Sequence, residues 1–186
     1  EVGKTYTIRA TYKDFSAHST THIPYRATFD SIRVTEHNTK MNIVGYANNL
    51  KIGIPYIIMA RTTDQRQYKI CPMGAFRANN SNMAITINNP LNFTDENIMQ
   101  QTLFPKKDSI SIAIKFAEIG EEEYQFWNSF IAQNMTQGVF FMETHSNIIS
   151  NIQNGNGYWC GMGSTEYIVK LNKTNLYIFD NQSIRN

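Results

Sequence analysis

Cysteine is nearly absent from this sequence of 186 residues: the only two are Cys71 and Cys160, 89 positions apart. That scarcity excludes the Cys-x-x-Cys pairs of metal and redox sites. A disulfide between them would stabilise the fold by about 4–5 kcal/mol. Nothing in the sequence brings two such distant residues together, so two separate buried thiols are favoured. A chain of this length can bury a sufficient core without covalent bridges.

Long apolar runs and clustered charges are also missing. No stretch of about 18 apolar residues occurs, so no membrane-spanning helix is expected. The 17 basic and 15 acidic residues are spread along the chain, and Lys106-Lys107 is the only adjacent basic pair. A nucleic-acid groove needs clustered Lys and Arg, so nucleic acid is excluded as a partner. The start at Glu1, without a signal segment, indicates a trimmed N-terminus.

Asparagine is abundant instead, with 21 residues, while charged residues make up only 17% of the chain. The surface is therefore expected to be polar but weakly charged. Together with the many Thr and Tyr residues, this composition favours a secreted β protein over a cytosolic helical enzyme.

Alternation of apolar and polar residues predicts strands along most of the chain. Residues 5–12 place Tyr6, Ile8 and Tyr12 on one face and are expected to form a hairpin with the Thr-rich run at 18–23. Most of 72–105 is expected to be ordered loop. Further strands are predicted at 28–35, 42–47, 56–61, 67–71, 83–87, 109–116, 166–171 and 176–179. The run at 56–61 is almost continuously apolar, which predicts a central strand covered on both faces.

One helix is predicted, at about 120–136. Gly120 can serve as its N-cap, and three consecutive glutamates, 121–123, suit the positive end of the helix dipole. Apolar residues recur at spacings of three and four: Tyr124, Trp127, Ile131 and Met135, with Phe126 and Phe130 widening the buried face. The expected fold is therefore mainly β, an antiparallel β-sandwich or partly open barrel with one packed α-helix.

Glycine is scarce too, and four of the ten glycines gather in the stretch 146–163, beside several asparagines. Both residue types tolerate tight turns, so this stretch predicts a shaped loop that presents Tyr158 and Trp159. Aromatic side chains on a braced loop can bind a sugar or a protein partner. Tyr158 and Trp159, with Asn156 and Phe141, are thus the candidate contact residues. The alternative is that Trp159 plugs the end of the β core.

No catalytic, metal or cofactor site is predicted. His18 and His22 share a strand face but have no third ligand at metal spacing. Cys160 could pair with His145 as nucleophile and base, but it lacks a setting that stabilises a thiolate. The Gly-x-Gly pairs at 155–157 and 161–163 lack the strand-then-helix context of a phosphate-binding loop.

Several stretches, in their order along the chain, resemble one family. They are Gly3 to Ile8 with Thr21 to Pro24, then Phe29 to Ile32, Phe93 to Glu96, the strand after Asp108 leading to the helix at Glu123, and Ser146 to Ile148 with Asn154 to Gly161. The chain resembles the C-terminal two thirds of the Bacteroidetes outer-membrane lipoproteins known as domain of unknown function 4249.

That resemblance implies an exported lipoprotein, lipid-anchored at the outer membrane and often encoded near TonB-dependent receptors. Membrane contact is expected only through an N-terminal lipid anchor that this chain lacks. Family members usually carry an additional N-terminal β domain. Residues 1–24 would then be the closing hairpin of that upstream domain, or an edge of the main domain at 25–186. Tyr6, Ile8 and Tyr12 are accordingly expected to pack on the main domain or on upstream chain.

The expected function is a non-catalytic accessory or binding component of an outer-membrane uptake system. Its partner would be a TonB-dependent receptor, with a glycan or peptide as further candidates. One alternative is a glycan- or peptide-processing enzyme, which needs two carboxylates brought together by folding. The candidates for that pair are Asp95, Glu96, Asp108 and Glu143. A structural spacer domain is the second alternative.

Overall fold

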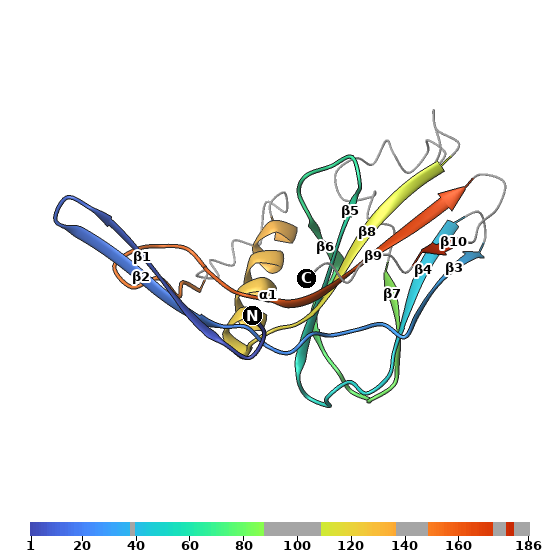
Figure 1. Cartoon of the computed structure of the whole chain (residues 1–186), viewed down its shortest axis with the longest axis horizontal. Coiled ribbons are helices and arrows are strands. Elements are labelled where there is room, and N and C mark those ends of the chain that lie inside the picture. Colours follow the sequence, from blue (N-terminus) through green and yellow to red (C-terminus); the bar gives the residue numbers. More distant parts are fainter. Residues whose placement is uncertain (38–39, 88–108, 137–148, 173–177, 181–186) are drawn as a thin grey trace.

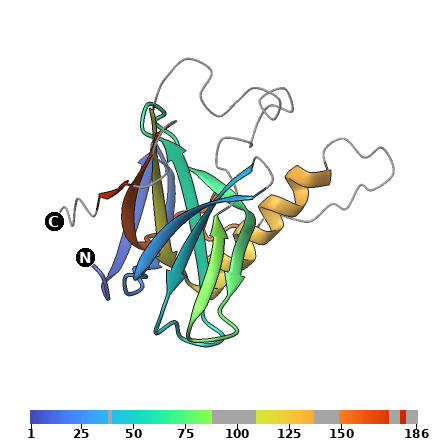
Figure 2. The same cartoon turned by 90° about the vertical axis from the view of Figure 1, so that its right-hand side faces the viewer.

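The computed structural model describes residues 1–37, 40–87, 109–136, 149–172 and 178–180. Two antiparallel sheets form a sandwich, one helix lies on the outer face of the larger sheet, and a two-stranded hairpin projects from the sandwich (Figures 1 and 2). The prediction of a mainly β fold with one helix is confirmed, in the form of a two-layered sandwich. Among the described residues, no helix combines the length and apolar character needed to span a membrane.

The larger sheet has five strands in the order β10-β9-β8-β5-β6. The strands are β5 (Pro55–Thr62), β6 (Lys69–Arg77), β8 (Ser109–Glu118), β9 (Gly163–Asn172) and β10 (Ile178–Asp180). β5 is buried along most of its length, as its continuous apolar sequence predicts, although the middle position belongs to β8. β8 pairs with β5 on one side and with ten residues of β9 on the other.

The smaller sheet contains β3 (Ser31–His37), β4 (Lys40–Ala47) and β7 (Met83–Ile87), in the order β3-β4-β7. The core between the two sheets is closed by stacked aromatic rings: the Phe29 and Phe116 centroids lie 4.3 Å apart with planes inclined by 10°. The Tyr167 hydroxyl accepts a hydrogen bond of 2.7 Å from the Phe29 main-chain N–H. The segment leading into β3 is thereby fixed to β9 of the other sheet.

Helix α1 (Glu121–Thr136) agrees with the predicted bounds. Its Tyr124 and Trp127 pack on Ile57, Ala75 and Ala117, which form part of a second apolar cluster on the outer face of the larger sheet. One predicted member of the buried face lies elsewhere, since Phe130 is 37% exposed. Its ring contacts the rings of Phe126 and Trp127 but stays accessible to solvent.

The hairpin pairs β1 (Thr5–Tyr12) with β2 (Phe15–His22) along the full length of both strands. Lys13 and Asp14 form the turn, with Lys13 in the left-handed region at φ 51°. The register gives the hairpin one apolar and one polar face. The apolar face carries the pairs Tyr6–Thr21, Ile8–Ser19, Ala10–Ala17 and Tyr12–Phe15, and the polar face carries Thr5–His22, Thr7–Thr20, Arg9–His18 and Thr11–Ser16.

The prediction that residues 72–105 are mostly loop is wrong at its start. β6 continues to Arg77, through Pro72 and Gly74. Both residue types normally interrupt strands. Here the pairing with β5 shifts register between Ile57 and Met59, and Gly74 adopts φ 69° beneath Ile131 of α1. An irregularity in the strand thus accommodates both residues. Residues 88–105 of that prediction lie outside the described residues.

Candidate functional site

The glycine-rich loop before β9 lies along the hairpin. His18 and Gln153 exchange two main-chain hydrogen bonds, of 3.2 and 2.9 Å. The Ser19 hydroxyl donates to the Asn151 carbonyl at 2.9 Å, and the Thr21 hydroxyl accepts from the Gly161 N–H at 3.0 Å. The loop therefore lies along the outer edge of β2 and contacts Ala17, Ser19 and Thr21 on the apolar face, but leaves Phe15 uncovered.

Asparagine and glycine shape this loop as predicted. The Asn151 side chain donates to the Trp159 carbonyl at 2.7 Å and accepts from the Trp159 N–H at 2.9 Å. Left-handed backbone occurs at Asn154, with φ 59°, and at Gly157, with φ 142°. The conformation of the loop is thus fixed by its own side chains.

The predicted contact residues fall in different surroundings. The Tyr158 ring is half-buried and stacks on Phe126 of α1, with centroids 4.3 Å apart and planes inclined by 13°. Trp159 is also half-buried, whereas Asn156 is exposed. Phe141 lies outside the described residues. A contact role for these residues stays a prediction, and the structure adds that Tyr158 joins the loop to the helix.

A buried carboxyl group lies beside this junction. Glu123 is only 4% exposed, and its carboxylate accepts a hydrogen bond of 3.2 Å from the Trp127 indole. Burial raises the pKa of Glu123, against smaller opposing effects of hydrogen bonds from Cys160, Trp127 and the Gly120 main chain. Sequence reasoning assigned Glu123 only to the helix dipole and missed this buried position.

The Glu123 carboxylate also raises the pKa values of two neighbouring side chains. Burial, followed by the nearby Glu123 carboxylate, raises the pKa values of the Cys160 thiol and the Tyr158 hydroxyl. Burial alone raises the pKa of Cys71, in the sandwich core, to about 12. Both cysteines are free thiols, as expected, but only Cys71 is buried, whereas Cys160 is half-buried. Their raised pKa values disfavour the thiolate that nucleophilic chemistry requires.

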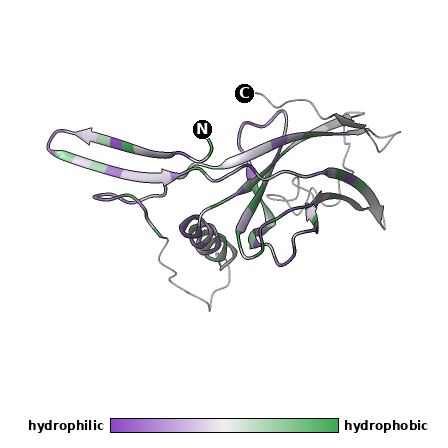
Figure 3. Cartoon of the chain, turned by 60° about the horizontal axis from the view of Figure 1, so that its bottom comes forward, coloured by the Kyte–Doolittle hydropathy of each residue, from purple (hydrophilic) through white to green (hydrophobic). Residues whose placement is uncertain are grey.

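The most exposed apolar surface lies on the hairpin. Of the nine large hydrophobic side chains that are exposed among the described residues, six belong to residues 1–25. Four of the six form the uncovered part of the apolar face: Tyr6 is 38% exposed, Ile8 45%, Tyr12 73% and Phe15 56%. We call these four residues the hairpin stripe. Figure 3 shows the hairpin projecting from the sandwich, with hydrophobic positions along it.

The exposure of the hairpin stripe bears on one expectation from the sequence. The alternation in residues 5–12 located these side chains, which were expected to pack on the main domain or on upstream chain. The described residues do not bury them, and packing on upstream chain stays a prediction. Exposed apolar side chains gathered on one element mark an interaction surface more often than scattered ones do.

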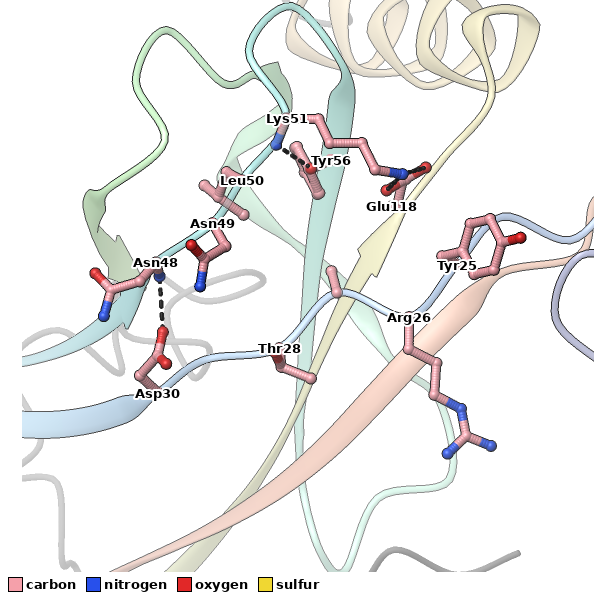
Figure 4. Close-up of a pocket in the computed structure, with 11 residues that line it drawn as sticks. Tyr25, Arg26, Thr28, Asp30, Asn48, Asn49, Leu50, Lys51, Tyr56 and Glu118 are labelled. Carbon is pink, nitrogen blue, oxygen red and sulfur yellow. Dashed lines mark hydrogen bonds and ion pairs between the residues drawn. The ribbon is translucent and has the colours of Figure 1, made fainter.

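A small pocket of about 190 Å³ lies where the segment after the hairpin passes the loop between β4 and β5 (Figure 4). Lys51 forms an ion pair of 3.1 Å with Glu118, and its main-chain N–H donates to the Tyr56 hydroxyl at 3.0 Å. The Asp30 carboxylate accepts a bond of 2.7 Å from the Asn48 N–H. Two basic side chains, Arg26 and Lys51, and two acidic ones, Asp30 and Glu118, line the pocket, so its formal charges balance.

Neither a metal site nor a catalytic arrangement emerges from the part of the chain that the structure describes. No group of three or more His, Cys, Asp or Glu residues is positioned to hold a metal ion there. His18 and His22 lie on the polar face of the hairpin, where the His22 Nδ1 is 3.3 Å from the Thr5 hydroxyl. The acids of the enzyme alternative, Asp95, Glu96, Asp108 and Glu143, lie outside the described residues, as does His145.

Comparison with known proteins gives one result. A family model described as domain of unknown function (DUF4249) matches residues 1–168. No curated protein and no solved structure matches the chain.

Proposed function

The chain belongs to the DUF4249 family, and from that premise we propose that it is a non-catalytic binding protein of the cell envelope. In this proposal it is an accessory component of an outer-membrane uptake system, lipid-anchored at that membrane. Its partner is a TonB-dependent receptor. The anchor, the compartment and the receptor come from the family resemblance of the sequence.

The hairpin stripe is the observation that supports a binding role. Tyr6, Ile8, Tyr12 and Phe15 expose apolar area on an element that projects from the sandwich. Exposure of each side chain to water is unfavourable, because burying a side chain of this size lowers the free energy by about 1.5–3 kcal/mol. Aromatic residues are also the side chains that most often dominate the energy of protein interfaces. A protein partner that covers the stripe gains this free energy on binding.

Hydrogen bonds within the hairpin and from the neighbouring loop also favour the hairpin stripe as a contact surface. On the polar face, the Thr7 and Thr20 hydroxyls lie 3.0 Å apart, and the Arg9 Nε donates to the Ser16 hydroxyl at 2.9 Å. The loop at 149–162 holds the edge of β2. The hairpin is therefore braced on one face and one edge, so binding on the stripe orders few additional groups.

Affinity purification of the full-length tagged protein from its native outer membrane tests this function. An Ile8→Thr/Tyr12→Thr variant removes apolar area from the stripe and keeps good strand-forming residues. The matched control is Ile52→Thr/Met73→Thr, which makes similar changes at exposed apolar side chains outside the hairpin. Circular dichroism and thermal unfolding establish that both variants fold.

We expect a TonB-dependent receptor to co-purify with the wild type and the control. The amount of receptor recovered with the stripe variant should be at least about tenfold lower. Equal recovery of the receptor with all three proteins would show that the stripe is not the contact. Recovery of the protein alone in every case would refute the binding function and leave the spacer and enzyme alternatives.

A further inference from the structure

Two separate elements bury the carboxyl group of Glu123. Helix α1 supplies Trp127, whose indole N–H donates to the carboxylate at 3.2 Å. The loop at 149–162 supplies the Cys160 thiol, which hydrogen-bonds to the carboxyl group, and the Tyr158 hydroxyl, which lies within reach of its charge. The preceding glutamate of the same turn, Glu122, has no such cover and is exposed. The burial of Glu123 therefore depends on the loop lying on the helix.

The surroundings of Glu123 offer little to balance a negative charge. Arg77, on the neighbouring strand β6, is paired with Glu121 instead. Glu122 adds negative charge near Tyr158. The rest of the junction is apolar and includes side chains from β5, β6, β8 and the loop, namely Ile57, Ala75, Ala117 and Met162. An ionised Glu123 is thus an unpaired charge beneath the loop, which is unfavourable.

The loop transmits the state of this junction to the hairpin. The Asn151 side chain bonds to both main-chain groups of Trp159, and the Asn151 carbonyl accepts from the Ser19 hydroxyl of β2. The Gly161 N–H donates to a second hydroxyl of β2. Trp159 and Gly161 flank Cys160, so movement of Cys160 away from α1 also displaces groups that hold β2.

We infer that Glu123 is a proton-controlled latch: the loop at 149–162 is held on α1 most firmly while the Glu123 carboxyl group is protonated, and ionisation of that group promotes release of the loop. Release also loosens the bonds between the loop and β2. The latch is a conformational device that the proposed binding function does not require, so each can fail without the other.

The direction of the pH effect follows from the two environments of Glu123. Burial raises its pKa in the docked loop, and release into water returns the pKa toward the ordinary value of 4.5. Release therefore becomes about tenfold more favourable for each pH unit between about 4.5 and the docked-state pKa, above which it levels off. Released molecules remain a minority throughout, so the half-buried Cys160 thiol still reacts mainly in the docked loop.

Site-resolved hydrogen exchange of the full-length protein between pH 5 and pH 8 tests the latch. Each rate is divided by the intrinsic rate of an unprotected amide at the same pH. The Trp159 and Gly161 amides report release of the loop, and the amides of the buried strand β5 report global unfolding. Glu123→Gln replaces the carboxyl group by a neutral amide of the same shape. Glu122→Gln is the matched control at an exposed position of the same turn.

In the wild type and in Glu122→Gln, we expect the corrected rates at Trp159 and Gly161 to rise about tenfold per pH unit until Glu123 is ionised in the docked loop. In Glu123→Gln they should stay constant with pH. Both amides should exchange at least about tenfold faster than those of β5, as a local opening requires. Should Glu123→Gln fail to fold, Glu123→Met supplies a second neutral side chain of similar length and should give the same constant rates.

Three results would overturn the latch. If Glu123→Gln kept the pH dependence of the wild type, another group would control the loop. If the corrected wild-type rates did not change with pH, release of the loop would not expose Glu123. If the loop amides were as strongly protected as those of β5, the loop would leave α1 only when the whole fold opens.

Discussion

The ring of Phe126 on α1 lies parallel to the ring of Tyr158 in the glycine-rich loop, with 4.3 Å between the centroids. The same loop is hydrogen-bonded at Gln153 to His18 of the hairpin. It therefore joins the helix to the hairpin. Substitutions at Tyr158 should consequently change the stability of the fold as well as any surface that the loop offers.

Replacing Tyr158 by Ala should lower the free energy of unfolding by about 2 kcal/mol, because a half-buried aromatic ring is lost. Tyr158→Phe, the matched control, keeps the stacked ring and should remain within about 0.5 kcal/mol of the wild type. Urea unfolding of Tyr158→Ala, Phe126→Ala and the double variant should give a coupling energy of about 1 kcal/mol. Additive effects of the two substitutions would contradict a stacking contribution.

The protonation of Glu123 should contribute to the pH dependence of the free energy of unfolding. Burial raises the pKa of Glu123 above the ordinary value of 4.5. The carboxyl group therefore keeps its proton in the native state at pH values where the unfolded state has released it. Stability therefore falls as pH rises from about 4.5 through the native pKa of Glu123. Glu123→Gln removes this part of the decline.

Urea unfolding between pH 4 and pH 8 measures that difference. The wild type should lose stability more steeply than Glu123→Gln in the lower part of the range, and the two curves should run parallel above the native pKa. Glu122→Gln is the matched control, since Glu122 is an exposed neighbour in the same helical turn. Parallel curves for Glu123→Gln and wild type over the whole range would argue against a raised pKa.

The reactivity of Cys160 should depend on Glu123. The nearby carboxylate is one of the causes that raise the pKa of this thiol, after burial. Glu123→Gln should therefore lower that pKa and speed the reaction of Cys160 with a disulfide reagent at pH 8 several-fold. Cys71 provides the internal control, because burial alone accounts for its raised pKa. Mass spectrometry of each labelled cysteine gives the two rates, and an unchanged Cys160 rate would refute the coupling.

Gly163 should tolerate no side chain. A Cβ atom at this position would lie 2.2 Å from the Pro24 carbonyl oxygen and 2.7 Å from that of Tyr25. Because both are main-chain atoms, Gly163→Ala has to displace the segment that joins the hairpin to β3, and should cost about 3 kcal/mol or more. Gly120→Ala, where a Cβ atom meets nothing within 4 Å, should cost less than about 1 kcal/mol. Thermal unfolding compares the two, and similar melting temperatures would contradict the close approach.

Local patterns in the sequence predicted the elements that depend on local physics. The alternation at Tyr6, Ile8 and Tyr12 gave the hairpin, and the spacing of Tyr124 and Trp127 gave the helix. β6 was missed beyond Cys71 because Pro72 and Gly74 normally end a strand, and only pairing with β5 and packing under α1 reveal why they are tolerated here.

The candidate site depended on long-range contacts that no local pattern contains. Asparagine and glycine predicted a shaped loop, but not that Gln153 would pair with His18. Three consecutive glutamates predicted a helix start, but not that Glu123 would be buried beside Cys160 and Trp127. Similarly, the apolar face of the hairpin was visible in the sequence, whereas its exposure followed only from the absence of a covering element among the described residues.

The contacts that brace the hairpin connect residues that are far apart in the sequence. Ser19 bonds to Asn151 across 132 positions, and Gly161 bonds to Thr21 across 140. During synthesis the hairpin therefore emerges long before the loop that secures it, and contacts between distant residues form late in folding. A nascent chain released before Gly161 should thus present both hairpin edges, and chaperones would be most needed in that interval.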